Sequence, residues 1–140
     1  MKKLLIERIS AWLVFFVFAF FSINVYAGEF GDLKKKASDA RDSLLAMLKN
    51  KDKRGADQQK LVKDTADAVS AQLAKMKAPA GQEGKFKELV DAWNAFKKTR
   101  EDELVPLILS GKQEDAEKLG GGIQKGRIKK VMDLCDELDK

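Results

Sequence analysis

The sequence predicts an all-α fold, an antiparallel up-down-up-down four-helix bundle that follows an N-terminal signal peptide. Four long segments repeat apolar residues at helical spacing, and short turns join them. No segment alternates apolar and polar residues in the way typical of strands. We expect residues 1–27 to be the signal peptide and residues 28–140 to form the bundle, a length sufficient for one domain.

The first residues have the organisation of a secretory signal. A basic start is followed by the uncharged apolar run Ala11–Phe21, which is shorter than the ~20 residues of a membrane-spanning helix. Val25-Tyr26-Ala27 matches the small-x-small cleavage pattern, so we expect cleavage after Ala27. The alternative is an uncleaved anchor. The chain is therefore expected to be exported and periplasmic, or anchored to the inner membrane if the segment is retained.

The first two helices are predicted over about residues 30–50 and 56–77. The first has a heptad seam of apolar residues, Phe30, Leu33, Ala37, Ala40, Leu44 and Met47. The second gathers its larger residues on one face, Leu61, Val62, Thr65, Val69, Leu73 and Met76. Gly55 and the run 79–81 mark the turns that bound the second helix.

The last two helices are predicted over about residues 82–109 and 113–138, and both contain a local conflict. The third has the seam Phe86, Leu89, Trp93, Phe96, Arg100, Glu103 and Leu107, with Pro106 expected to kink it. The fourth has the apolar face Ile128, Val131, Leu134, Cys135 and Leu138, preceded by the run 120–122. Three glycines cost roughly 3 kcal/mol of helix propensity, so this run either breaks the helix or allows a close approach.

Composition argues against several classes of function. Without residues 1–27 the net charge of +5 falls to +3, and the charges are mixed along every predicted helix, which does not indicate a nucleic-acid-binding stripe. The chain has no histidine, and so lacks the usual zinc or haem ligand and the usual catalytic base. The acidic runs 101–103 and 114–117 lack the histidines of a di-metal bundle. We therefore expect no metal, no cofactor and no enzyme activity. Cys135 is the only cysteine and is expected to be buried.

Polar residues at core-facing positions suggest a ligand site. Arg100 and Arg127 would hold the carboxylate of a small anionic ligand, helped by Gln124 and Thr65, because forked guanidinium donors suit carboxylates. Trp93 would form an apolar wall. The competing interpretation is structural. In it Arg100 pairs with Glu103, Arg127 reaches solvent along its aliphatic stem, and Trp93 belongs to the core.

The runs 93–96 (WNAF), 108–111 (ILSG) and 114–119 (EDAEKL) carry a resemblance to a known family. Together they are similar to the four-helix-bundle sensor domains of methyl-accepting chemotaxis receptors, over about residues 86–138. The resemblance implies a periplasmic ligand-sensing bundle that is often dimeric through its first helix. No ligand-binding arginine of that family maps onto this sequence position by position. We therefore expect a stand-alone sensor-like domain.

Two functions remain open from the sequence. The first is an exported binding module for a small carboxylate that acts in signal transduction or chemoreception with a membrane receptor or kinase, as a possible homodimer. The second is a periplasmic structural or interaction protein, adaptor-like or chaperone-like, without a ligand pocket. A solvent-filled, positively charged pocket would favour the first, and a filled core would favour the second.

Overall fold

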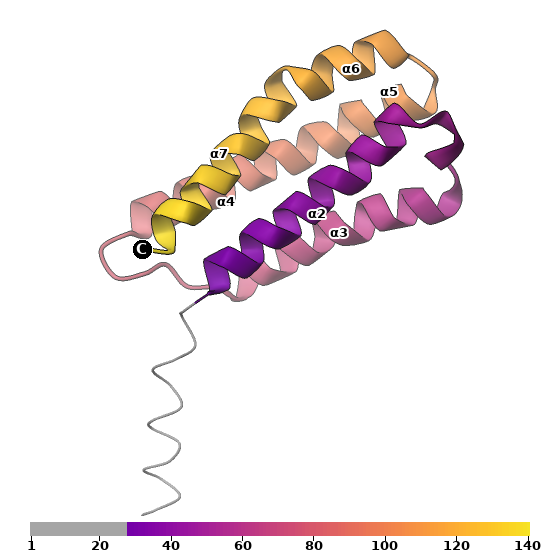
Figure 1. Cartoon of the computed structure of the whole chain (residues 1–140). Helices are drawn as coiled ribbons and strands as arrows, with labels where there is room; N and C mark the ends of the chain where they lie inside the picture. The colour runs from indigo at the N-terminus through magenta and orange to yellow at the C-terminus, as the bar shows by residue number, and fades with distance from the viewer. Residues whose placement is uncertain (1–27) are drawn as a thin grey trace, which may run out of the picture.

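A computed structural model describes residues 28–140, and every regular element among them is helical (Figure 1). The predicted helical bundle is thus confirmed, whereas the predicted signal peptide lies outside the described residues. In chain order the elements are α2 (Glu29–Lys49), η1 (Lys51–Lys53), α3 (Ala56–Lys75), α4 (Glu83–Thr99), the π-helix η2 (Arg100–Leu104), α5 (Val105–Leu109), α6 (Gln113–Gly121) and α7 (Ile123–Leu138).

The helices pack through the apolar seams that the sequence predicts. All six residues of the predicted α2 seam are buried, because their spacing keeps them on one face of a regular helix. The face of α3 differs at one position, since Leu61 is 48% exposed and Ala66 is buried in the same helix. Among residues 28–140, none of the helices has the length together with the apolar character that a bilayer crossing requires.

One end of the bundle joins the start of α2 to α4 and α7. The Phe30 ring meets the Phe86 ring edge-on at 6.3 Å between centroids, and Lys34 Nζ lies 2.7 Å from Asp136 Oδ2. Figure 1 shows α2 beside α3 and α4 beside α7, with the C-terminus at this same end. These contacts close the end of the bundle nearest Gly28.

At the opposite end Arg54, in the turn between α2 and α3, joins three helices, and Gln113 of α6 adds a hydrogen bond to the Leu48 carbonyl oxygen at 3.0 Å. Arg54 donates hydrogen bonds to the carbonyl oxygens of Met47 and Leu48, which lack partners within α2 because the helix ends there. It also donates to the Ile108 carbonyl oxygen at 3.0 Å and to Gln113 Oε1. Arg54 therefore ties the end of α2 to α5 and α6.

The apolar core is divided into two clusters. The larger, which we name the closed half, draws on α2, α3, α4 and α7 and comprises Phe30, Leu33, Ala37, Ala40, Ala66, Val69, Leu73, Met76, Leu89, Trp93, Phe96, Ile128, Val131, Leu134, Cys135 and Leu138. The smaller, the open half, comprises Leu44, Met47, Leu48, Val62, Leu104, Ile108 and Ala116. The buried polar residues Ser43, Thr99, Arg100 and Gln124 lie between the two halves and form the polar layer.

A π-helical turn shifts the seam of the third predicted helix. The backbone N–H of Val105 donates to the carbonyl oxygen of Arg100, five residues earlier, just before Pro106, which has no N–H to give. The wider turn buries Leu104 and Ile108 and leaves Glu103 exposed. The sequence prediction of Glu103 as a seam residue is therefore wrong, because it assumed an unbroken α-helical period.

The fourth predicted helix is also divided, and the cause is the glycine run. α6 ends at Gly121 and α7 begins at Ile123. A Cβ atom at Gly120 would lie 3.2 Å from Leu48 Cδ2, so the missing side chain lets α6 approach α2 closely at that point. Both outcomes considered for the glycines, a break and a close approach, occur.

Candidate functional site

Arg100 is the buried charge at the centre of the polar layer. Its side chain is 1% exposed, and Nη1 donates to the Ala40 carbonyl oxygen of α2 at 2.9 Å. Nη2 donates to the Val62 carbonyl oxygen of α3. Burial lowers the pKa of the guanidinium to about 10, against the opposing fields of Glu101 and Asp67. Arg100 thus joins three helical segments through backbone oxygens.

This geometry contradicts the ion pair considered for Arg100. Glu103 is exposed, and no carboxylate among residues 28–140 forms a salt bridge with Arg100. Two helix carbonyl oxygens solvate the buried charge instead, each of them a strong acceptor that can take a second hydrogen bond. Both terminal nitrogens of Arg100 are therefore directed at backbone oxygens of α2 and α3.

Arg127 occupies a different environment. Its Nη1 donates to the Ala95 carbonyl oxygen at 3.3 Å and to Thr99 Oγ1, and its side chain is half-buried. It lines a shallow depression between α4 and α7 that also includes Ile123 and Gly126. Arg127 and Arg100 therefore bind different groups.

Thr65 and Trp93 satisfy their polar atoms within the bundle. Thr65 Oγ1 donates to the Leu61 carbonyl oxygen at 2.7 Å and lies 3.0 Å from Ser43 Oγ. Trp93 is fully buried, and its Nε1 donates to Ser70 Oγ at 3.0 Å. Trp93 is thus a core residue of the closed half, in agreement with the structural interpretation of this position.

Gln124 is the predicted site residue with an unsatisfied polar atom. It is 2% exposed, and its Nε2 donates to the Phe96 carbonyl oxygen at 3.0 Å. Its Oε1 is buried and accepts no hydrogen bond from any described residue. An unpaired buried acceptor is costly, and such groups are rare in folded proteins. Of the five predicted residues, only Gln124 also lines the groove described next.

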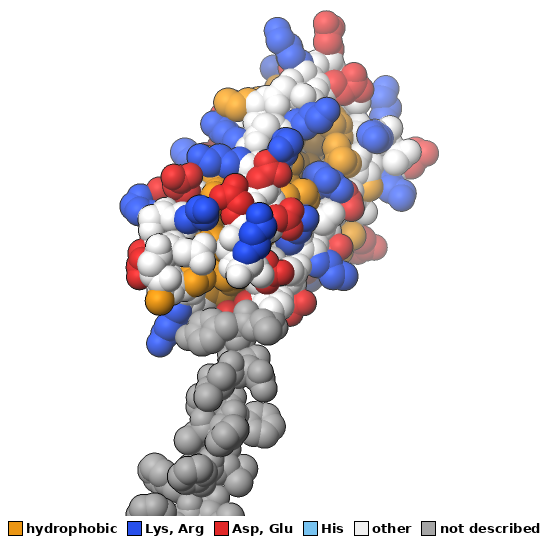
Figure 2. Space-filling model, turned by 60° about the vertical axis from the view of Figure 1, so that its left-hand side comes forward, with side chains coloured by type: hydrophobic (Ala, Val, Ile, Leu, Met, Phe, Trp, Pro, Cys, Tyr) orange, Lys and Arg blue, Asp and Glu red, His pale blue; other side chains and the backbone are white. Residues whose placement is uncertain are grey.

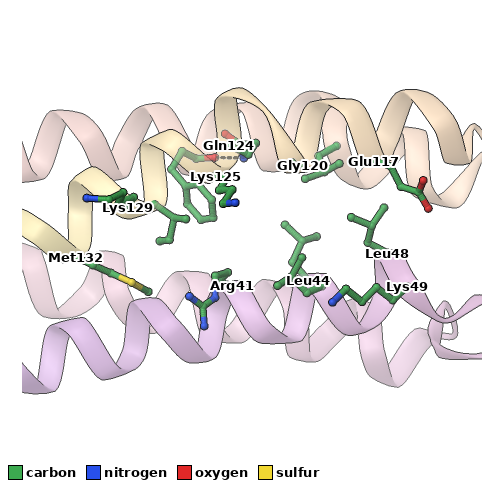
Figure 3. Close-up of a pocket in the computed structure, with 15 residues that line it drawn as sticks. Arg41, Leu44, Leu48, Lys49, Glu117, Gly120, Gln124, Lys125, Lys129 and Met132 are labelled. Atoms are coloured by element: carbon green, nitrogen blue, oxygen red, sulfur yellow. Dashed lines mark hydrogen bonds between the residues drawn. The ribbon is translucent and has the colours of Figure 1, made fainter.

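A groove of about 580 Å³ lies between α2 on one side and α6 and α7 on the other (Figure 3). Apolar side chains form most of its surface, and charged ones stand at its edges, a mixture also visible on the face drawn in Figure 2. Its lining residues are Arg41, Leu44, Leu45, Leu48, Lys49, Phe96, Leu104, Glu117, Gly120, Gly121, Gln124, Lys125, Ile128, Lys129 and Met132.

The cations around this groove outnumber the acids. Four basic residues line it, with Glu117 as the only acidic one. Arg41 and Lys129 form ion pairs with Asp42 and Asp133, whose carboxylates are exposed and do not line the groove. Lys125 has no carboxylate within salt-bridge distance among residues 28–140. The groove thus combines an apolar surface with an excess of positive charge.

Sequence reasoning did not identify this groove, although two signals indicate it in retrospect. Leu44, Leu45 and Leu48 give α2 a wider apolar face near its end, and Gly120 and Gly121 leave part of the opposite wall without side chains. Among residues 28–140, no cluster of three potential metal ligands is present. The apolar walls and the basic residues at the edges of the groove suit an organic ligand that binds by apolar contact and by charge.

Comparison with protein-family models, with curated proteins and with solved structures finds no match to this chain.

Proposed function

We propose that this chain is an exported, sensor-like binding module whose four helices form an antiparallel up-down-up-down bundle and whose groove holds a small anionic ligand. Its role is recognition and not catalysis. Ligand binding is signalled to a membrane receptor or kinase, as the resemblance to chemotaxis sensor domains suggests. The groove between α2 and α6–α7 is the observation that carries this proposal.

The dimensions and the chemistry of the groove support ligand binding. Small-molecule sites commonly enclose about 300–1,000 Å³, with mostly apolar walls and a few polar groups, and this groove is of that kind. Its excess of basic residues favours an anion over a neutral or cationic molecule.

The polar layer has a supporting role in this proposal. Arg100 fixes α2 and α3 relative to η2 through two backbone oxygens, and so sets the position of Leu104, which lines the groove. The proposed ligand site is therefore the groove and not the pair Arg100 and Arg127. Gln124 belongs to the polar layer and also lines the groove.

Filling the groove tests the proposal. Gly121 lines it, and a Cβ atom added there meets nothing within 4 Å, so Gly121→Leu should occupy the groove without a clash. Gly126→Leu is the matched control, because Gly126 is equally unobstructed but lines the depressions between α4 and α7. We expect carboxylates that raise the melting temperature of the wild type to lose that effect in Gly121→Leu and keep it in Gly126→Leu.

Native mass spectrometry of the exported protein complements this screen. It reports the processed mass, a homodimer if one forms, and any retained small molecule. A protein that no carboxylate stabilises, or that is stabilised equally after Gly121→Leu, would contradict a ligand site in the groove.

A second candidate is an interaction protein of the adaptor or chaperone kind. The observation that favours it is Ile123, which is 52% exposed and lines the depression beside Ala92 and Ala95. In that case Ile123→Asp would abolish binding to a purified membrane partner, and Gly121→Leu would leave this binding unchanged. Gly121→Leu, which fills the groove, and Ile123→Asp, which alters the depression, therefore separate the two functions.

A further inference from the structure

The charges are unevenly distributed along the groove (Figure 3). Toward one end Arg41 lies on the α2 wall, and Lys125 and Lys129 lie on the α7 wall across from it. Toward the other end Lys49 of α2 and Glu117 of α6 contribute one charge of each sign and form no ion pair with each other, and Glu117 accepts a hydrogen bond from Gln113 instead. The groove therefore has a positive end and an end without excess charge.

The stretch between these ends is apolar. Leu44 and Leu48 form one wall, and Leu104 comes from the π-helix behind them. On the opposite wall Leu48 packs against Gly120, whereas a Cβ atom at Gly121 would meet nothing within 4 Å, so the space beside Gly121 stays open. Such a strip accommodates a hydrocarbon chain and provides few hydrogen-bond donors or acceptors for a polar ligand body.

The length of the strip suits an extended chain. At about 1.5 Å per residue, the α-helical rise separates Arg41 from Lys49 by about 12 Å along the axis. A small dicarboxylate would contact only part of this distance, whereas a linear alkyl chain can follow it. The apolar strip and the positive end together suit an amphipathic ligand that carries its negative charge at one terminus.

The cations at the positive end are at least partly exposed and therefore accessible to an anionic group. Lys125 has no ion-pair partner among residues 28–140. Arg41 pairs with Asp42 and also donates to Ser38 Oγ, and Lys129 pairs with Asp133. Exposed ion pairs of this kind contribute little to stability and can exchange with another carboxylate. An anionic head placed there would gain three cationic neighbours.

We propose that the ligand of the groove is a monomeric single-chain amphiphile with an anionic head, such as a long-chain carboxylate. The head lies beside Arg41, Lys125 and Lys129, and the hydrocarbon chain lies along Leu44, Leu48 and Leu104. This inference rests on the proposed function and specifies the chemical class of the ligand.

A chain-length series at constant head group tests the hydrocarbon part. Calorimetric titration of the whole exported protein would use octanoate, decanoate and dodecanoate as monomers, with succinate as the short reference. Each added CH₂ should tighten binding about fourfold until the chain fills the groove. Gly121→Leu should abolish the dependence on chain length, and Gly126→Leu should retain it.

A matched pair of lysine variants tests the head group. Lys125→Ala should weaken dodecanoate binding several-fold and leave dodecanol binding unchanged, because only the carboxylate faces the lost charge. Lys130→Ala is the control, since Lys130 is also on α7 but lines the depressions between α4 and α7. Equal effects of the two variants, or equal losses for dodecanoate and dodecanol, would overturn the assignment of the head.

The outcomes distinguish this inference from the proposed function. If succinate binds as tightly as dodecanoate and Gly121→Leu prevents it, the groove binds anions but the amphiphile is wrong. If no carboxylate binds wild type at all, the proposed function fails as well. Binding to vesicles of anionic phospholipid without binding to monomeric dodecanoate would replace the free amphiphile by a membrane surface and overturn this proposal.

Discussion

The closed half and the open half of the bundle differ in how their helices pack. In the closed half four long helices meet through large side chains such as Trp93 and Phe96, whose ring centroids are 5.5 Å apart. In the open half α2 meets the short helix α6, and the core consists of fewer and mostly aliphatic residues. The difference shows how one bundle can combine a tightly packed core with a groove that runs from Ile128 at the edge of the closed half into the open half.

The polar layer lies between the closed half and the open half, and its residues have neighbours in both. Arg100 lies between Phe96 of the closed half and Leu104 of the open half on the third helical rod. On α7 Gln124 precedes Ile128 of the closed half. A layer whose donors bind backbone oxygens fixes the helices at the boundary without filling the groove beyond it.

The largest expected difference between the halves concerns leucines of a single helix. Leu33→Ala should lower the free energy of unfolding by about 2–5 kcal/mol, because Leu33 is fully buried and its removal leaves a cavity. Leu45→Ala should cost only about 1 kcal/mol, since Leu45 is half-buried at the groove. Urea unfolding followed by circular dichroism measures both. Equal losses would show that the open half is packed as tightly as the closed half.

Arg100 tests the boundary itself. Arg100→Ala should lower the free energy of unfolding by about 2–3 kcal/mol, because it removes two charge-assisted hydrogen bonds and leaves a cavity. Arg100→Met should cost less than half as much, since Met fills the volume and removes a desolvated charge. Chemical denaturation of both variants gives the comparison. If Arg100→Met were as unstable as Arg100→Ala, the two hydrogen bonds of Arg100, and not its volume, would account for the stabilisation.

The closed half could be predicted from the sequence, and the reason is its regularity. Phe30, Leu33 and Trp93 follow an unbroken α-helical period, so their burial follows from spacing alone. Arg100 was placed in the interior by the same rule. The hydrogen-bond partners of Arg100, two backbone carbonyl oxygens, could not be predicted, because every residue has such an oxygen and the pattern of side chains does not indicate which one is used.

The open half was predicted less well because local backbone events set its register. The π-turn before Pro106 exchanges Glu103 for Leu104 on the buried face, a change of one residue that spacing rules cannot detect. The break at Gly122 separates α6 from α7 and leaves the groove beside Gly120 and Gly121. The glycines indicated an irregularity, but its geometry depends on the packing against α2.

Substitutions of Gly121, the last residue of α6, and of Gly122, which follows it, should have smaller effects on stability, and these should be opposite in sign. A Cβ atom at Gly122 would lie 2.8 Å from the Lys118 carbonyl oxygen, a backbone atom that cannot move freely. Gly122→Ala should therefore lower the free energy of unfolding by about 1–2 kcal/mol. Gly121→Ala meets no obstruction and should raise it by up to about 1 kcal/mol through helix propensity. Thermal unfolding that shifts in the same direction for both would contradict this account of the break.

The smallest expected effect concerns the ion pair that joins α3 to α4 beside the polar layer. Asp67 accepts hydrogen bonds from Lys63 and from Lys97, the latter at 3.0 Å, and these hold the pKa of its carboxyl below the ordinary value of 3.8. Asp67→Asn should cost less than about 1 kcal/mol at neutral pH, because the carboxylate is 41% exposed and screened by solvent.

The pH dependence of this effect has a defined sign. Because the pKa of Asp67 is lower in the folded protein, its stabilising contribution is present above pH 3.8 and is lost as the pH falls through the folded value. The difference between wild type and Asp67→Asn should therefore shrink in acid and also in high salt. Asp64→Asn is the control, since Asp64 pairs only with Lys60 of its own helix. If its loss matched that of Asp67→Asn, the link between α3 and α4 would contribute nothing beyond an ordinary pair within one helix, and the boundary would be held by Arg100 and the apolar contacts alone.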